Sequence, residues 1–147
     1  TSAGVPYVAI DNDSSLVLRE HRTGHPVFYG DGRRPDVLRS VGIADASLVI
    51  VTVNDFAASE NIVATLHRAH PDVKILARGH DASQCKALMQ FGATLAISEN
   101  LEASIDQARE ALAHEHVGSE QIETLLRVFR EDNYAKFHGR AAKDPMA

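Results

Sequence analysis

Acidic or small polar residues follow several short apolar runs of this sequence, at the places where α/β proteins usually bind ligands. The segments are Asp11-Asn12-Asp13, Gly30-Asp31, Asn54-Asp55 and Arg78-Gly79-His80-Asp81. Asp11 ends a Val-Ala-Ile run, and a carboxylate there can accept hydrogen bonds from both hydroxyls of a ribose while repelling a 2′-phosphate. Asp11 therefore favours an adenosine ligand with a free ribose over NADP.

Each of these residues also has a purely structural interpretation. Asp11 or Asp13 can cap the helix that follows. Gly30-Asp31 can bring an adenine edge close to backbone and carboxylate, but the same residue types are common in turns. Arg78 can meet a phosphate or a carboxylate of a ligand, whereas a surface ion pair is the commoner fate of a single arginine. Both interpretations stay open from these residues alone.

Histidine and cysteine show no arrangement that indicates catalysis or metal binding. His67 and His70 share a predicted helical face, but no carboxylate or cysteine completes a ligand set. His114 and His116 should point apart on a helix. Cys85, the single cysteine, lies mid-helix among apolar residues and is interpreted as a packing residue. We expect neither a metal site nor catalytic residues, and therefore no enzyme.

Five short apolar runs must position the polar residues, and we expect each to be a strand. They are residues 5–10, 25–29, 47–53, 73–77 and 94–97. The run from Leu48 to Val53 does not alternate polar with apolar residues, which is typical of a parallel strand covered on both faces. It should be a central strand.

Helix signals alternate with these runs. Ser14 and Ser15 can cap a helix that ends at Gly24, and Pro35 suits a first helical turn. Asn54 or Asp55 can cap a third helix, and Asp81 and Ser83 can open a fourth. Alternating strands and helices predict βαβ units with right-handed crossovers, in a doubly wound parallel sheet of the α/β class.

The pattern changes after residue 98. Two consecutive apolar stripes at helical spacing follow, centred on Ile105 and Leu126, with a turn at 117–119. We expect a sheet domain over 1–98, a helical hairpin over 99–138 and a polar, frayed tail over 139–147. A hairpin off the sheet has few partners for a second apolar face, so it is a candidate for homodimer contacts.

Composition narrows the classes of function. Twenty acidic and fifteen basic residues give a net charge of −5, which is unsuited to nucleic acid, so we expect no nucleic-acid partner. The longest apolar run is far below the ~20 residues that cross a bilayer, and a single cysteine suits a reducing compartment.

Several segments together resemble the RCK, or TrkA N-terminal, nucleotide-binding domain. They are Tyr7-Val-Ala-Ile-Asp-Asn-Asp13, Val27-Phe-Tyr-Gly-Asp31, Pro35-Asp-Val-Leu-Arg-Ser-Val-Gly42, residues 46–55, Pro71-Asp-Val-Lys-Ile-Leu-Ala-Arg78 and Phe91-Gly-Ala93. Within that group the chain is most similar to the cytoplasmic domain of Kef-type monovalent cation:proton antiporters.

The resemblance implies a Rossmann-like regulatory domain that binds NAD(H) or AMP, forms a homodimer, and gates a transmembrane potassium:proton antiporter domain, fused or associated, at the cytoplasmic face of the inner membrane. It implies that Asp11 and Asp13 lie at the ribose and that Asp31 faces the adenine. Asn54, Asp55 and Arg78 would border the phosphates or a second nucleoside.

Two further features of the family concern its thiol-adduct regulator. Asn133 stands where Kef proteins place an asparagine that contacts a glutathione adduct. Ser98 stands where they carry an arginine, which puts a response to a thiol adduct in doubt.

The largest departure from the family is at the start of the chain. The family begins with a strand, a Gly-x-Gly-x-x-Gly loop and a helix, and the ten residues before Asp11 cannot hold these elements. We therefore expect a Rossmann-like sheet that lacks its first β-α unit and has two unpaired strand edges. We also expect weak phosphate affinity, because the glycine loop usually cradles the phosphates.

Two alternatives come from other classes. A response-regulator-like receiver domain shares the doubly wound sheet and its acidic pocket, but the lysine it needs after its fifth strand is replaced by Ala77-Arg78-Gly79-His80. A fragment of an NAD-binding oxidoreductase would need a substrate domain, for which 147 residues leave no space.

Overall fold

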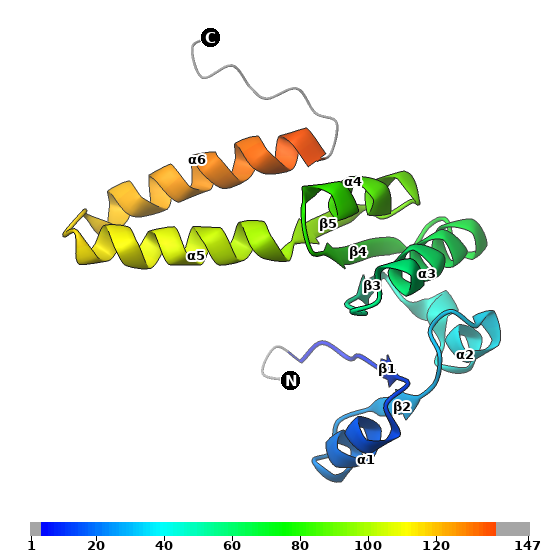
Figure 1. Cartoon of the computed structure of the whole chain (residues 1–147). Helices are drawn as coiled ribbons and strands as arrows, with labels where there is room; N and C mark the ends of the chain where they lie inside the picture. Colours follow the sequence, from blue (N-terminus) through cyan, green and yellow to red (C-terminus); the bar gives the residue numbers. More distant parts are fainter. Residues whose placement is uncertain (1–3, 138–147) are drawn as a thin grey trace. The chain divides into compact units, whose positions relative to one another are not determined.

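The computed structural model describes residues 4–137, and the chain divides into two compact units, residues 1–47 and 48–147 (Figure 1). Helices alternate with short parallel strands in both units, so the predicted α/β class is confirmed. The predicted tail, 139–147, lies outside the described residues.

The N-terminal unit holds a two-stranded parallel sheet. Its elements are β1 (Ala9–Asp11), α1 (Ser14–Arg22), β2 (Val27–Tyr29), α2 (Pro35–Ser40) and a 3₁₀ turn, η1 (Ile43–Asp45). The sheet register aligns Asp11 with Tyr29, so Asp11 and the residues after Tyr29 lie together at the carboxyl end. Pro35 begins α2, as its fixed φ favours.

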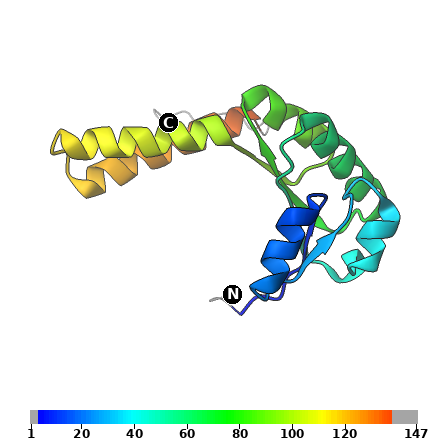
Figure 2. The same cartoon turned by 60° about the horizontal axis from the view of Figure 1, so that its bottom comes forward.

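The C-terminal unit holds a three-stranded parallel sheet and the predicted helical hairpin. Its elements are β3 (Leu48–Val51), α3 (Phe56–Ala69), β4 (Lys74–Gly79), α4 (Ala82–Gln90), β5 (Leu95–Ser98), α5 (Glu99–His114) and α6 (Ser119–Phe137). The strand order is β3-β4-β5. Because both right-handed crossovers run in the same direction, α3 and α4 pack on one face of this sheet (Figure 2).

The helices α5 and α6 lie side by side and share a small apolar core (Figure 1). Ile105, Ile122 and Leu126 form its buried centre, and residues such as Leu101 and Leu112 pack against it. This agrees with the stripe predicted from the sequence.

Two expectations about local structure were wrong, and one short element was missed. The first strand begins at Ala9 rather than near Val5, and η1 was not predicted. His116 is not helical, because its φ of 61° lies in the left-handed region of the turn that ends α5.

The strand β3 is also less covered than its apolar run predicted. Val51 is buried, whereas Leu48 and Ile50 are 49% and 59% exposed. The side chains of a strand alternate between two faces, and α3 and α4 cover only one of them. Within residues 4–137, β3 pairs with β4 alone, so it is an edge strand of its sheet, whereas the sequence predicted a central strand. β1 likewise pairs with β2 alone.

Candidate functional site

Asp11 and Asp13 are positioned by the end of β1 and the start of α1. Asp13 is the N-cap of α1, and its Oδ1 accepts from the backbone N–H groups of Ser15 and Leu16 at 2.8 and 3.2 Å. Asp11 Oδ1 accepts from the backbone N–H of Asp13 at 2.8 Å. No donor among the described residues reaches Asp11 Oδ2. The Asp13 N–H therefore orients the Asp11 carboxylate through Oδ1.

Gly30 follows β2 directly beside Asp11, because its backbone N–H donates to the Asp11 carbonyl oxygen at 2.9 Å. A Cβ at Gly30 would lie 2.6 Å from Val37 Cγ1 and 3.3 Å from Ile10 Cγ2. The glycine thus allows α2 to pack closely against the sheet. This packing is a structural reason for the glycine, and the approach of an adenine edge to Gly30 stays a prediction.

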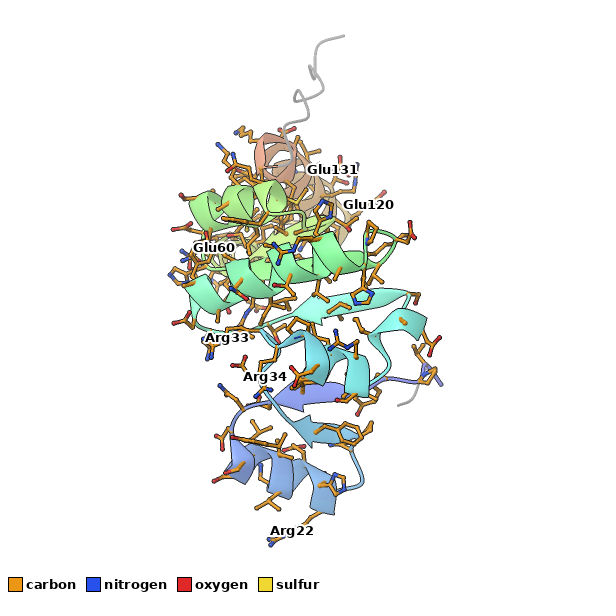
Figure 3. The ribbon with its side chains drawn as sticks, turned by 90° about the vertical axis from the view of Figure 1, so that its right-hand side faces the viewer. Arg22, Arg33, Arg34, Glu60, Glu120 and Glu131 are labelled. Atoms are coloured by element: carbon orange, nitrogen blue, oxygen red, sulfur yellow. The ribbon has the colours of Figure 1, made fainter. Side chains whose placement is uncertain are left out.

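Asp31 is engaged by an arginine that sequence reasoning did not single out. Arg33 donates from Nε and Nη2 to both carboxylate oxygens at 2.7–3.0 Å, and its backbone N–H donates to Asp31 Oδ1 at 2.9 Å. These hydrogen bonds lower the pKa of Asp31 to about 2. Arg33 and Arg34 both come from the loop between β2 and α2 (Figure 3). A ligand at Asp31 must therefore share its carboxylate with Arg33.

In the C-terminal unit, Asn54, Asp55 and Arg78 come together around the ends of β3 and β4. Arg78 Nη2 donates to the Thr52 carbonyl oxygen at 2.6 Å and to Asn54 Oδ1 at 2.5 Å. Asp55 is the N-cap of α3 and accepts from the Ala58 N–H at 2.7 Å. The turn after β3 thus fixes the side chain of Arg78, and the start of α3 fixes that of Asp55.

Glu99 completes this cluster and was also missed from the sequence. Its Oε1 lies 2.7 Å from Arg78 Nη1, and its Oε2 lies 3.4 Å from His80 Nδ1. Glu99 is the first residue of α5. The ion pair that the sequence left open for Arg78 is therefore present, with a partner 21 residues away that no local pattern indicates.

The residues tied to a thiol-adduct regulator lie on α6 and at the end of β5. Asn133 donates from Nδ2 to the Phe129 carbonyl oxygen of its own helix at 2.8 Å. Ser98 is buried, caps α5, and donates its backbone N–H to the Tyr134 hydroxyl at 3.2 Å. The Tyr134 hydroxyl in turn donates to Glu102 Oε1 at 2.9 Å.

Arg130 closes this network from α6. Its Nε and Nη2 donate to the two carboxylate oxygens of Glu102 at 3.2 and 2.8 Å. Burial is the main cause that raises the pKa of Tyr134 to about 12. The network joins α6 to the start of α5 at the carboxyl end of β5.

Three further features of residues 4–137 concern metal binding, membrane-spanning helices and the cysteine. No group of histidine, cysteine, aspartate and glutamate there could hold a metal ion, and no helix there is long and apolar enough to span a bilayer. Cys85 is fully buried, as expected of a packing residue, and burial raises the pKa of its thiol to about 11.

Comparison with families of known proteins identifies the family of this chain. The model of the TrkA-N domain family matches residues 1–99. The chain belongs to the TrkA-N domain family. This membership agrees with the RCK resemblance seen in the sequence.

The relatives of this TrkA-N chain are potassium efflux antiporters. It is 33% identical over 87% of its length to K(+) efflux antiporter 3, chloroplastic, of Arabidopsis thaliana, and 31% identical over 88% to the glutathione-regulated potassium-efflux system protein KefC of Cronobacter sakazakii. It spans 16% and 21% of the lengths of these relatives.

A solved structure shows the same fold. The Shewanella denitrificans Kef C-terminal domain in AMP-bound form is 23% identical and matches with a TM-score of 0.72, covering 90% of this chain and 94% of that one. The Rossmann-like arrangement followed by a helical hairpin is therefore shared.

Proposed function

We propose that the chain is a nucleotide-binding regulatory segment of a potassium:proton antiporter, and that it binds AMP or NAD(H) through Asp11. The orientation of Asp11 carries this proposal. One oxygen is fixed by the Asp13 N–H, and Oδ2 is left for a ligand at the carboxyl end of β1. A carboxylate in this position suits the paired hydroxyls of a ribose.

Further ligand contacts are proposed for each unit separately, from the family resemblance. Asp31 is proposed to face the nucleobase, where its low pKa keeps it an acceptor for an exocyclic amino group at any physiological pH. Asn54, Asp55 and Arg78 are proposed to contact phosphates or a second nucleoside. The solved Kef C-terminal domain is an AMP-bound form, which supports an adenosine nucleotide, although the likeness to this chain concerns the fold.

Calorimetric titration of the 147-residue chain with AMP, NADH and NADPH tests this proposal. We expect AMP and NADH to bind and NADPH to bind at least about tenfold more weakly than NADH, because its 2′-phosphate meets the Asp11 carboxylate. Affinity should be weaker than micromolar, since no glycine-rich phosphate loop occurs in the sequence.

The variant Asp11→Asn separates the ligand role from a structural one. An amide oxygen can still accept from the Asp13 N–H, but the charge-assisted bond to ribose is lost, so AMP affinity should fall about tenfold or more. Asp45→Asn, an exposed carboxylate change in η1, is the matched control and should bind like the wild type. Unchanged binding by Asp11→Asn would contradict the proposal.

The proposed partner is a transmembrane antiporter domain, fused or associated, which would place the chain at the cytoplasmic face of the inner membrane. The potassium efflux relatives support this partner, and the chain itself spans only 16% and 21% of two of them. The coding sequence upstream of Thr1 tests fusion directly. Many hydrophobic spans followed by a strand and Gly-x-Gly-x-x-Gly are expected, and a stop codon would contradict a fused partner.

A homodimer is proposed through the outer face of α6. Leu125, Val128 and Phe129 lie on one exposed stripe of this helix, and Leu125 and Phe129 are each about half exposed, at 51% and 50%. Sedimentation should show a dimer, and Leu125→Glu should make it a monomer without unfolding the hairpin. A wild-type monomer at high concentration would overturn the proposed homodimer.

Asn133 lies on the same helix, and we propose it as a residue that contacts a regulatory ligand.

A further inference from the structure

Arg78 is held on one side by neutral acceptors. Its Nη2 donates to the Thr52 carbonyl oxygen and to Asn54 Oδ1, both of which belong to the turn after β3. These bonds fix the guanidinium across the carboxyl ends of β3 and β4 without neutralising it. Its other terminal nitrogen, Nη1, is directed to an anionic partner.

In the structure that partner is the chain's own Glu99, with 2.7 Å between Arg78 Nη1 and Glu99 Oε1. The pair is partly open to solvent, since the side chains of Arg78 and Glu99 are 32% and 43% exposed. A ligand anion that approaches Arg78 Nη1 therefore meets the Glu99 carboxylate. Asp55, the N-cap of α3, adds a negative charge after β3, and the imidazole of His80 faces the other oxygen of Glu99.

We propose that Glu99 is an internal competitor for anions at Arg78, and that it weakens the binding of phosphate groups to this arginine of the C-terminal unit. An incoming phosphate must displace the Glu99 carboxylate or lie beside it. An uncharged nucleoside meets neither obstacle. The inference rests on the proposed nucleotide function, and it adds which residue controls the response to ligand charge.

The size of the effect follows from the exposure of the pair. A partly exposed ion pair is weak and easily displaced, and a carboxylate a few ångströms from a phosphate dianion adds repulsion of similar size. Removing the charge of Glu99 should therefore strengthen phosphate binding about three- to tenfold.

The variant Glu99→Gln tests this directly, because it keeps the size of the side chain and removes the charge. Glu110→Gln, an exposed change on the same helix, is the matched control. Calorimetry should show that Glu99→Gln binds AMP and inorganic pyrophosphate about three- to tenfold more tightly, with adenosine affinity unchanged. Glu110→Gln should leave all three affinities unchanged.

Several results would overturn the proposal. One is AMP binding by Glu99→Gln that is unchanged or weaker, which would make Glu99 a positioning residue or a bystander. Another is an affinity for adenosine that rises as much as the affinity for AMP. If neither AMP nor adenosine binds the wild type, the proposed nucleotide function fails, and pyrophosphate alone decides the role of Glu99. Tighter pyrophosphate binding by Glu99→Gln then supports the competitor role, and any other result overturns it.

Discussion

Removing one hydroxyl, in the variant Tyr134→Phe, should loosen the hairpin from the sheet of the C-terminal unit. The Tyr134 hydroxyl joins three elements, because it accepts from the Ser98 N–H at the end of β5 and donates to Glu102 of α5 from its own place on α6. Phenylalanine keeps the ring and removes the hydroxyl that makes these two bonds. The variant thus isolates the polar part of the contact.

The expected cost comes mainly from Ser98. A buried N–H that loses its acceptor costs about 1–3 kcal/mol, and Ser98 is only 1% exposed. Glu102 is partly exposed and keeps both hydrogen bonds from Arg130, so the loss of its bond from the Tyr134 hydroxyl should cost little. We expect the free energy of opening α6 to fall by about 1–3 kcal/mol.

Native-state hydrogen exchange measures this locally. Protection of amides in α6, such as that of Leu126, should fall about 5- to 150-fold in Tyr134→Phe, while the amides of β1 and β2 stay unchanged. Tyr29→Phe is the matched control, because Tyr29 is 68% exposed. Protection of α6 that changes less than about threefold would refute the proposed anchoring role of the hydroxyl.

The pKa of Tyr134 gives the same contact a pH dependence. Its folded pKa of about 12 lies above the ordinary value of 10, so the neutral phenol is favoured by folding. This contribution to stability is fully present below pH 10 and is lost as the pH rises toward 12. In ultraviolet titration the Tyr134 phenol should ionise with a pKa of about 12, assigned by its loss in Tyr134→Phe. A Tyr134 phenol that ionises near pH 10 would contradict this.

The remaining predictions concern packing and ionisation. Gly30→Ala should destabilise the N-terminal unit by about 1–3 kcal/mol in urea unfolding, and Val37→Ala should relieve part of that cost; additive effects would show that packing is not the reason for the glycine. The carboxyl of Asp31 should titrate near pH 2 by NMR, with its stabilising effect present above about pH 4 and lost as the pH falls toward 2; Arg33→Ala should return the midpoint toward 4, and an unchanged midpoint would contradict the ion pair. Cys85 should resist alkylation in the folded chain at about pH 8 and react on unfolding; rapid labelling of the native chain would contradict its burial.

Much of the fold could be predicted because it depends on local signals. The order of strands and helices follows from short β-branched runs separated by capping residues, and Asp55 and Asp81 do cap their helices as the sequence indicates. The stripe from Ile105 to Leu126 likewise predicted the hairpin and its shared core.

Contacts between elements that are distant in the sequence could not be predicted from such local signals. The apolar run of β3 indicated burial on both faces, but exposure depends on which helices pack there, and Ile50 has no helix over it within the described part of its unit. Arg78 and Glu99 are 21 residues apart, and Arg130 and Glu102 are 28 apart. Such pairs form only once the topology brings their elements together, so no spacing in the sequence indicates them.

The central claim is that an adenosine nucleotide binds at Asp11, and mapping of backbone amide shifts by NMR during an AMP titration tests it most directly. We predict saturable shifts that include the amides of Asp11 and Asp13 and of Gly30 and Asp31 at the carboxyl end of the β1–β2 sheet. The same titration of Asp11→Asn should need about ten times more AMP. Saturable shifts that leave these four amides unmoved, or no shifts at millimolar AMP, would contradict the account.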